Sequence, residues 1–393
     1  MQAAKKIHIL TGIRSEYDIL APVIGAINDT PGLEAGVIVT GAHLGARHGY
    51  SVRQIEADGF NIVARIDSLL ASDGLAGRVK GLGLQLAGMT DLFAMNRPDM
   101  LVVMGDREEP MAGAIAASYH HIPIVHIGGG DHAEDGNVDN PIRHAVSKLA
   151  HLHMATTELS GRRLRALGEE AWRINVVGAS GLDRLISTPV MTRAELDAAL
   201  GAGWAGAPYV VLLYHPTITD FDAASAHIQA IAKVLSESGL RVAAMAPNTD
   251  PGSDAVQAGL NQLARDCDRV KLFTFLERRV FVNLLRHATA MIGNSSAGIL
   301  EAPTLGLPVV NIGRRQRDRE HAQNVIFTGY DPAEIAAALN RASSDQAFRD
   351  RVACCDTPYG DGKASRRIAD ILRDSPVDAR LLHKRFVMGD SDV

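Results

Sequence analysis

The feature that most constrains the fold of this chain is the alternation of short apolar runs with segments of helical periodicity. In the first half, the runs that we predict to be strands are Lys6–Leu10, Ala35–Thr40, Met100–Met104, Ile122–Ile127, His153–Thr156 and Ile174–Val177. The segments that we predict to be helices are Ile19–Ile27, Leu75–Met95, Glu109–Ala117 and Ile142–Leu149. Strands and helices in this order predict a parallel sheet that helices cover on both faces.

The same alternation starts again after residue 186. The predicted strands of this second half are Tyr209–Leu213, Arg241–Ala246, Val270–Phe273, Ala290–Ile292 and Val309–Ile312. Its predicted helices are Ala223–Ser238, Val256–Cys267, Glu277–His287 and Pro332–Ala342. We therefore predict an α/β fold with two doubly wound parallel-sheet domains, each with its own core.

A chain of 393 residues is longer than one ordinary domain, which agrees with two. We place the first domain at residues 1–182 and the second at 183–364, with a helical segment, Asp183–Trp204, connecting them. Residues 365–393 are predicted to form a helix that packs back on the first domain, followed by a loosely held polar tail. Ligands of open α/β sheets lie beyond the carboxyl ends of the strands, so we expect the ligand site in a cleft between the domains.

The composition excludes several classes of protein. The formal net charge is −5, from 40 Lys and Arg against 45 Asp and Glu, which argues against a nucleic-acid or membrane surface. No apolar run reaches the roughly 18–20 residues of a transmembrane helix, and the apolar part of the first segment is too short for a signal peptide. Cys267, Cys354 and Cys355 are odd in number and lack metal-ligand spacing, so we predict a reducing cytoplasm.

Polar and small residues follow the predicted strands of the first domain. Arg14 follows the first strand, where its guanidinium could clamp a phosphate through two hydrogen bonds. Asp106 follows another strand, in a position that suits a catalytic acid or a helix cap. Three consecutive glycines, Gly128–Gly130, indicate backbone packed against a ligand. Asp139 lies where a helix begins, so the helix dipole favours its ionised form, although Asp is also a common cap there.

In the second domain, the segment GNSSAG at residues 293–298 lies between a predicted strand and a predicted helix. Small residues at such a turn let backbone N–H groups and the hydroxyls of Ser295 and Ser296 approach an anion, and Glu301 could hold ribose hydroxyls. The segment also fits an ordinary turn with a serine helix cap. His215 follows another strand and could donate a proton to a leaving phosphate, or simply belong to a turn. No GxGxxG motif follows the first strand, so a dinucleotide cofactor is not indicated.

Nine segments, in order along residues 6 to 370, resemble the UDP-N-acetylglucosamine 2-epimerase family and specifically its hydrolysing branch. The segments are TGIRSEYDIL, GDRxE, HIxGGD, D-x3-RHAVSKLAHLH, YHP, APNTDPG, GNSSAGILEAP, NIGRRQRDR and YGDG. The resemblance implies the GT-B architecture, in which two Rossmann-like domains face each other across a cleft and the C-terminal one binds the nucleotide. It also implies a nucleotide-sugar substrate, no cofactor and no metal, and a homodimer or homotetramer.

The resemblance also implies roles for particular residues. Arg14, Ser295, Ser296 and Glu301 resemble contacts to the diphosphate and ribose. The residues predicted to be catalytic are Asp106, Asp131, Asp139 and His215. Further predicted contacts to substrate or nucleotide are Arg107, Arg143, Asn248, Phe275, Asn294 and Arg315. Many relatives have a glutamate where this chain has Gly128, so either Asp131 or Asp139 takes that acid–base role or the reaction differs.

The activity that the resemblance implies is conversion of UDP-GlcNAc to free N-acetylmannosamine and UDP, by elimination of UDP through a 2-acetamidoglucal and then hydration. The product would enter the synthesis of a nonulosonic acid, sialic or legionaminic. A second hypothesis is a UDP- or GDP-linked 2,4-diacetamido-6-deoxy sugar as substrate. Other hypotheses are a non-hydrolysing epimerase, a GT-B glycosyltransferase, and a nucleotide-sugar hydrolase or binding protein without epimerisation.

Overall fold

The computed structural model of the chain describes residues 4–46, 49–70, 75–132, 138–201, 203–217, 221–247, 252–274 and 276–388. The chain divides into two compact units. The first unit contains the chain up to His132, the stretch that ends at Ile186, and the chain from Tyr359 onward. The second unit contains Ser187–Pro358. The C-terminal segment therefore returns to the unit in which the chain begins.

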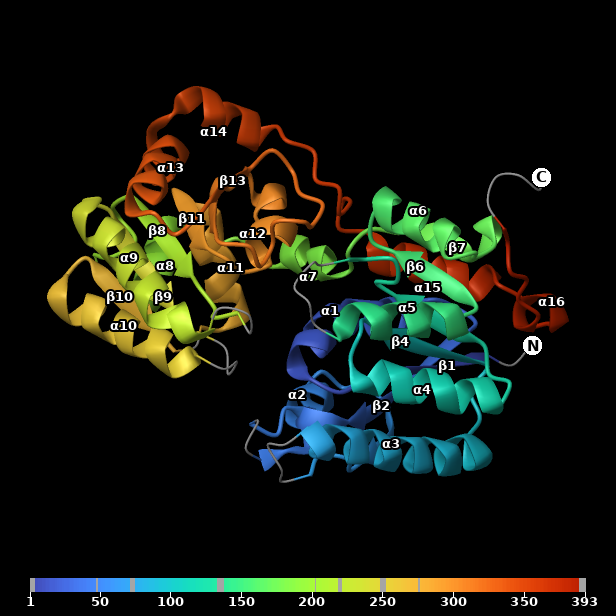
Figure 1. Cartoon of the computed structure of the whole chain (residues 1–393). Helices are drawn as coiled ribbons and strands as arrows, with labels where there is room; N and C mark the ends of the chain where they lie inside the picture. Colours follow the sequence, from blue (N-terminus) through green and yellow to red (C-terminus); the bar gives the residue numbers. More distant parts are fainter. Residues whose placement is uncertain are drawn as a thin grey trace. The chain divides into compact units, whose positions relative to one another are not determined.

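In its described residues the first unit has a seven-stranded sheet with strand order β3-β2-β1-β4-β5-β6-β7. Figure 1 labels five of these strands, β1, β2, β4, β6 and β7. The strands are β1 (Lys5–Thr11), β2 (Leu33–Thr40), β3 (Ile62–Ile66), β4 (Met100–Met104), β5 (Ile124–Ile127), β6 (Leu152–Ala155) and β7 (Ile174–Val176). The helices are α1 (Arg14–Asn28), α2 (Val52–Ala57), α3 (Leu75–Met95), α4 (Glu108–Tyr119), α5 (Asp139–Leu149), α6 (Glu158–Ala166), α7 (Gly181–Ser187), α15 (Ala364–Asp374) and α16 (Ala379–Leu382). Every strand pair in this sheet is parallel.

Helices cover both faces of this sheet because neighbouring strand residues point to opposite sides. Ile7 and Ile9 of β1 lie in a core with residues of α1 and α15. Leu10 lies in a second core with residues of α3 and α4. Since both sets of side chains are buried, β1 is buried continuously from Ile7 to Thr11, including the polar residues His8 and Thr11.

The second unit has a six-stranded sheet in its described residues, with strand order β10-β9-β8-β11-β12-β13. The strands are β8 (Tyr209–Leu213), β9 (Arg241–Met245), β10 (Val270–Phe273), β11 (Ala290–Gly293), β12 (Val309–Ile312) and β13 (Val325–Thr328). The helices are α8 (Arg193–Leu200), α9 (Ala224–Glu237), α10 (Ser253–Asp266), α11 (Arg278–His287), α12 (Ala297–Leu300), α13 (Pro332–Ser344) and α14 (Gln346–Ala353). All of its strand pairs are parallel as well. Two doubly wound parallel sheets confirm the predicted fold class.

Several elements differ from the sequence predictions, and the helices α2, α6 and α14 are among those not predicted. The strands β3 and β13 were not predicted, because both are edge strands whose side chains are mostly half-buried and give a weak apolar signal. The segment Asp183–Trp204 was predicted as one helical connection, whereas α7 and α8 are separate helices. Pro189 lies between them and disfavours a continuous helix.

The C-terminal tail, which the sequence predicted to be loosely held, makes hydrogen bonds to the first unit as far as Val387, whose backbone N–H donates to the carbonyl of Gly168 at 3.1 Å. The fully buried guanidinium of Arg173 donates hydrogen bonds to the carbonyls of Leu381, Arg380 and His383, at 2.8, 3.0 and 3.0 Å. Lys384 donates to the buried carboxylate of Glu169 at 2.7 Å. These contacts tie residues 380–384 to the β6–β7 side of the first sheet.

None of the helices in the described part of the chain combines the length and the apolar character that crossing a bilayer requires.

Candidate functional site

The first candidate site lies at the carboxyl edge of the seven-stranded sheet. The strand order reverses between β1 and β4, because the chain leaves β1 toward β2 on one side and returns to β4 on the other. In an open α/β sheet the loops after the strands form a crevice at this switch point. Arg14, which begins α1, and Asp106, which follows β4, lie on these two loops. The adjacent strand β5 leads into the glycine run and Asp131.

Arg143 brings two of the predicted catalytic segments together. Its guanidinium donates one hydrogen bond to the carboxylate of Asp106 and another, at 3.0 Å, to the backbone carbonyl of Asp131. Arg143 is only 6% exposed, so the ion pair with Asp106 is screened little by solvent. The side chain of Arg143 therefore fixes the loops after β4 and β5 relative to each other.

Arg143 belongs to the first turns of α5, the helix that begins at Asp139. A carboxylate at the first residue of an 11-residue helix is stabilised in its ionised form by the helix dipole. The carboxylates of Asp106 and Asp139 are therefore linked through a single helix and its arginine. Asp139 also lies near Arg78 of α3, whose pKa is raised, first by a hydrogen bond from its guanidinium to Glu108 and to a smaller degree by Asp139.

The glycine run has backbone conformations that favour glycine. The φ angles of Gly128 and Gly130 are +78° and +77°, in the left-handed region. A side chain at Gly130 would clash with the backbone of Ser160, since its Cβ would lie 2.2 Å from that carbonyl oxygen. A glutamate at Gly128 would carry backbone strain of about 1–3 kcal/mol in this conformation. The loop is thus built around glycine at this position.

Two buried glutamates beside the switch point were not selected from the sequence. Glu16 accepts a hydrogen bond from the backbone N–H of Gly12 at 3.0 Å, and Glu109 accepts one from Arg107 at 3.2 Å. Burial, with the neighbouring charge of Glu109, raises the pKa of Glu16 to about 8, and burial also raises the pKa of Glu109. The sequence signal that could have identified Glu16 and Glu109 is their position within the TGIRSEYDIL and GDRxE segments. The predicted substrate contact Arg107 is engaged with this pair.

The second candidate site lies at the carboxyl edge of the six-stranded sheet, where β8 and β11 are neighbours. Asn294 follows β11 and is 1% exposed. Its side-chain oxygen accepts from the backbone N–H of His215 at 2.8 Å, and its side-chain nitrogen donates to the His215 carbonyl at 2.7 Å. Asn294 therefore holds the backbone of His215 in place, which is a positioning role.

The arginine-rich loop after β12 also contacts this turn. Arg315 and Gln316 both donate to the carbonyl of Asn294, at 3.1 and 3.2 Å. The three predicted residues His215, Asn294 and Arg315 are thus brought together by direct contacts. Gln316 was missed because an amide inside a run of arginines carries no signal of its own.

The serine turn leads into a shorter helix than the sequence suggested. The helix α12 is a single turn, and Glu301 lies at its C-terminal end. The hydroxyl of Ser295 accepts from the backbone N–H of Ala297 at 3.4 Å. Glu301 accepts from Arg278 of α11 at 3.2 Å, and its second oxygen is buried without a hydrogen-bond partner among the described atoms. That oxygen is available to accept hydrogen bonds from ligand hydroxyls.

Asn248 and Phe275, the remaining predicted nucleotide contacts, lie outside the described residues. Within the described ranges, no group of three or more His, Cys, Asp or Glu side chains is arranged to hold a metal ion.

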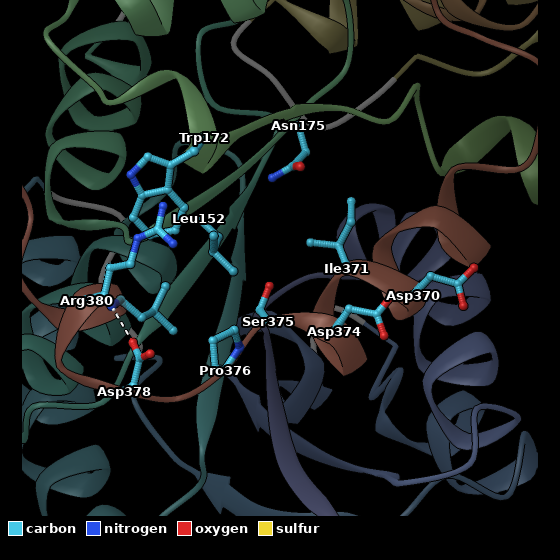
Figure 2. Close-up of a pocket in the computed structure, with 11 residues that line it drawn as sticks. Leu152, Trp172, Asn175, Asp370, Ile371, Asp374, Ser375, Pro376, Asp378 and Arg380 are labelled. Carbon is cyan, nitrogen blue, oxygen red and sulfur yellow. Dashed lines mark hydrogen bonds between the residues drawn. The ribbon is translucent and has the colours of Figure 1, made fainter.

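A cavity of about 350 Å³ in the first unit contains none of the predicted site residues. Its lining comes from the segments around Leu152 and Trp172 and from the C-terminal residues between Asp370 and Leu381 (Figure 2). Arg173 and Arg380 lie over the Trp172 ring at 4.2 and 4.5 Å from its centroid. Leu152 begins β6, so this cavity opens near the amino ends of strands, away from the edge where α/β sheets place ligands.

Two doubly wound parallel sheets in one chain define the GT-B class of fold. A family model described as UDP-N-acetylglucosamine 2-epimerase matches residues 25–373, so the chain belongs to that family.

Curated relatives and solved structures agree with this assignment. The chain is 33% identical over 380 residues to the UDP-N,N'-diacetylbacillosamine 2-epimerase (hydrolyzing) of Legionella pneumophila, covering 97% of this chain and 98% of that protein. It is 31% identical to the GDP/UDP-N,N'-diacetylbacillosamine 2-epimerase (hydrolyzing) of Campylobacter jejuni, covering 98% of this chain and 99% of that one. The structure of the UDP-GlcNAc 2-epimerase from Neisseria meningitidis bound to UDP-GlcNAc superposes with a TM-score of 0.80 at 20% identity, over 94% of this chain and 100% of that one.

Proposed function

We propose that this protein is a hydrolysing 2-epimerase of a UDP-linked 2-acetamido sugar, which releases UDP and the free 2-epimer. The observation that carries the proposal is the cluster of carboxylates at the edge of the first sheet. Arg143 of α5 joins Asp106 to the loop that contains Asp131, and Asp139 is the first residue of α5. Epimerisation at a carbon needs acid–base groups on both faces of the ring, which several nearby carboxylates supply.

The reaction follows from the chemistry of the sugar. The C2 proton becomes removable only as the C1–O bond to UDP breaks and positive charge grows at C1. In the first step a carboxylate, Asp106 or Asp139, takes the C2 proton, the C1–O bond electrons leave with UDP, and a C1–C2 double bond forms. In the second step water adds its oxygen to C1 while a proton returns to the opposite face of C2.

The leaving diphosphate must be stabilised as its charge develops. Arg14 and the Ser295–Ser296 turn are the residues that we propose for this role, with His215 as a hydrogen-bond or proton donor. Glu301 would accept hydrogen bonds from the ribose through its unpaired oxygen. The mutual bracing of Asn294, Arg315 and His215 supports a rigid nucleotide site.

The sugar substituents distinguish two candidate substrates. The Legionella and Campylobacter relatives are named for N,N'-diacetylbacillosamine, which favours a 2,4-diacetamido-6-deoxy sugar as the first substrate to assay. UDP-GlcNAc, which the Neisseria meningitidis structure contains, is the second.

The test incubates the protein with each nucleotide sugar in D2O and follows released UDP and sugar by NMR. We expect free 2-epimer with deuterium at C2. Release of the unepimerised sugar without deuterium would show a plain hydrolase, and an intact UDP-linked epimer would show the non-hydrolysing reaction. Sugar released only to an added acceptor would show a glycosyltransferase, and binding without any release would show a binding protein.

Substitution of the proposed acid–base residues completes the test. We expect Asp106→Asn and Asp139→Asn to lower kcat by about 10²–10⁴-fold, the usual contribution of a general acid or base. Asp91→Asn, at an exposed position of α3, is the matched control and should keep full activity. An Asp106→Asn protein with wild-type kcat would contradict this assignment.

A further inference from the structure

A buried histidine lies behind the carboxylates of the first unit and touches none of the predicted substrate contacts. His126, on β5, is 0% exposed. Its Nε2 lies 2.9 Å from the backbone oxygen of Gly105, the residue before Asp106. Its Nδ1 lies 3.0 Å from the hydroxyl oxygen of Ser147, a residue of α5. One imidazole therefore joins the strand that leads to Asp131, the loop that holds Asp106 and the helix that begins at Asp139.

The chemistry of the partners determines the tautomer of the ring. Burial lowers the pKa of His126 to about 3, so the ring is neutral near pH 7 and carries a single N–H. The Gly105 carbonyl can only accept a hydrogen bond, so that N–H must be on Nε2. The Nδ1 atom is then an acceptor, and the Ser147 hydroxyl must donate to it. Both hydrogen bonds therefore have a defined donor: the Ser147 hydroxyl donates to His126 Nδ1, and His126 Nε2–H donates to the Gly105 carbonyl.

The glycine loop packs directly against this pair. A Cβ atom on Gly129 would lie 2.8 Å from the Ser147 hydroxyl oxygen and 3.0 Å from His126 Nδ1. Gly129 must therefore be a glycine because Ser147 and His126 pack against it, on the side of the loop that faces the protein interior. Gly105 has a φ of +78°, which glycine adopts readily, and its carbonyl is the atom of this turn that His126 contacts.

We propose that His126 is a positioning residue for this active site, in which Nε2–H holds the Gly105–Asp106 turn and Nδ1 holds α5 through Ser147. Its effect on the reaction passes through the placement of Asp106 and Asp139. The kinetic test of this inference rests on the proposed function, because it measures turnover of a nucleotide sugar. The structural test does not depend on the proposed function.

The kinetic test compares substitutions that keep or lose the donor at the Nε2 position. His126→Gln places an amide N–H near Nε2 and should keep kcat within about tenfold of wild type, the effect of one neutral hydrogen bond. His126→Asn is too short to reach Gly105, and His126→Phe has no donor, so both should lose about 100-fold in kcat. The KM for the nucleotide sugar should change little, because Ser295, Ser296 and Glu301 lie in the second unit and Arg14 follows β1 rather than β4 or β5. Equal losses for Gln, Asn and Phe would overturn the proposal.

A matched control separates positioning from general damage. His8 on β1 is 3% exposed in the same sheet and packs against Gly36 instead of an active-site turn. His8→Gln should lower stability as His126→Gln does but leave kcat unchanged. A kcat loss in His8→Gln equal to that of His126→Asn would show that any buried histidine of this sheet has the same effect, and the proposal would be wrong.

The structural test needs no substrate. In the wild-type protein labelled with ¹⁵N-histidine, the ring signals that disappear in His126→Gln should report a neutral Nε2–H tautomer at pH 7.5. Crystal structures should show the Asp106–Arg143 pair intact in His126→Gln and displaced in His126→Asn. A Nδ1–H or protonated ring, or an undisplaced Asp106 in His126→Asn, would overturn the proposal. If no nucleotide sugar is turned over, the proposed function fails, and these structural results still decide the role of His126.

Discussion

At the scale of single residues, Gly293 shows how a glycine can be required by the backbone of a neighbouring strand. Its φ is +134°, and a Cβ atom there would lie 2.0 Å from the carbonyl oxygen of Leu213. That carbonyl also accepts the backbone N–H of Asn294 at 3.0 Å. A side chain at this position would therefore disturb both the pairing of β8 with β11 and the turn that braces His215.

We expect Gly293→Ala to lower the free energy of unfolding by more than about 3 kcal/mol, because backbone strain of about 1–3 kcal/mol adds to the clash. Urea unfolding followed by circular dichroism measures the change. Gly83→Ala is the control, since Gly83 is an exposed α3 residue with open space at its Cβ position, and alanine there should be neutral or stabilising. Equal stability of Gly293→Ala and wild type would contradict the clash.

The buried carboxyl of Glu16 predicts a particular pH dependence of stability. Its pKa in the folded protein is raised to about 8 from 4.5, so between these values the folded state holds a proton that the unfolded state has released. Stability from this group therefore falls as the pH rises from about 5 to 8. Glu16→Gln cannot titrate and can still accept from Gly12, so we expect a weaker decrease in Tm between pH 5.5 and 8.5.

Thermal unfolding of both proteins across that pH range measures the difference. Glu34→Gln, at an exposed position of β2, is the control and should keep the wild-type slope. Parallel Tm curves for Glu16→Gln and wild type would show that Glu16 does not hold the extra proton.

At the scale of elements, the C-terminal tail is fastened by one buried arginine. Besides its contacts to the tail, Arg173 donates to the His151 carbonyl at 3.1 Å and to Glu170 at 2.6 Å. A guanidinium suits this position because its N–H groups point in several fixed directions at once. Glu169, nearby, accepts from Lys148, His153 and Lys384, which lowers its pKa to about 2 against the effect of burial.

We expect Arg173→Met to destabilise the protein by at least about 1–3 kcal/mol, because several buried carbonyls lose their donor. The tail should also become sensitive to limited proteolysis after α15, which mass spectrometry would detect. Arg162→Met, at an exposed position of α6, is the control and should change neither property. A tail that stays protected in Arg173→Met would show that other contacts suffice.

Strands and helices could be predicted from the sequence where their own residues show a clear apolar pattern. The central strands β4 and β8 are continuous apolar runs because they are buried on both faces, and the sequence predicts them well. The strands β1 and β12 were predicted too, although each also buries a polar residue, His8 and Asn311. The helix α6 was missed because most of its side chains are polar and it buries little besides Leu164. The order of strands and the return of α15 to the first unit depend on contacts between distant segments, which periodicity does not report.

At the scale of the whole molecule, the proposed function divides the work between the two units. The nucleotide contacts that we propose from Ser295, Glu301 and their neighbours belong to the second unit, whereas Arg14 and the acid–base carboxylates Asp106 and Asp139 belong to the first. That both units act on one bound nucleotide sugar stays a prediction, and it has a direct consequence for ligand binding.

We expect UDP to stabilise the protein against thermal unfolding, by about 2.7 kcal/mol at a concentration 100 times its Kd. Ser295→Ala and Glu301→Gln should reduce this stabilisation, whereas Asp106→Asn should keep it while losing turnover. Differential scanning fluorimetry with a UDP titration measures both. If the stabilisation by UDP is lost in Asp106→Asn and kept in Glu301→Gln, the proposed assignment of nucleotide binding to Glu301 and of acid–base chemistry to Asp106 is wrong.

The sequence by itself determined the class of fold, the family and the loops that carry the candidate site, because apolar runs and ordered motifs are local properties of a chain. Only the tertiary structure decided which partners those residues have. Arg143 pairs with Asp106 across 37 positions of sequence, and Glu16 meets Glu109 although each belongs to a different helix. Such pairs form where strand ends converge on one edge of a sheet, and that convergence depends on strand order, which no single segment encodes.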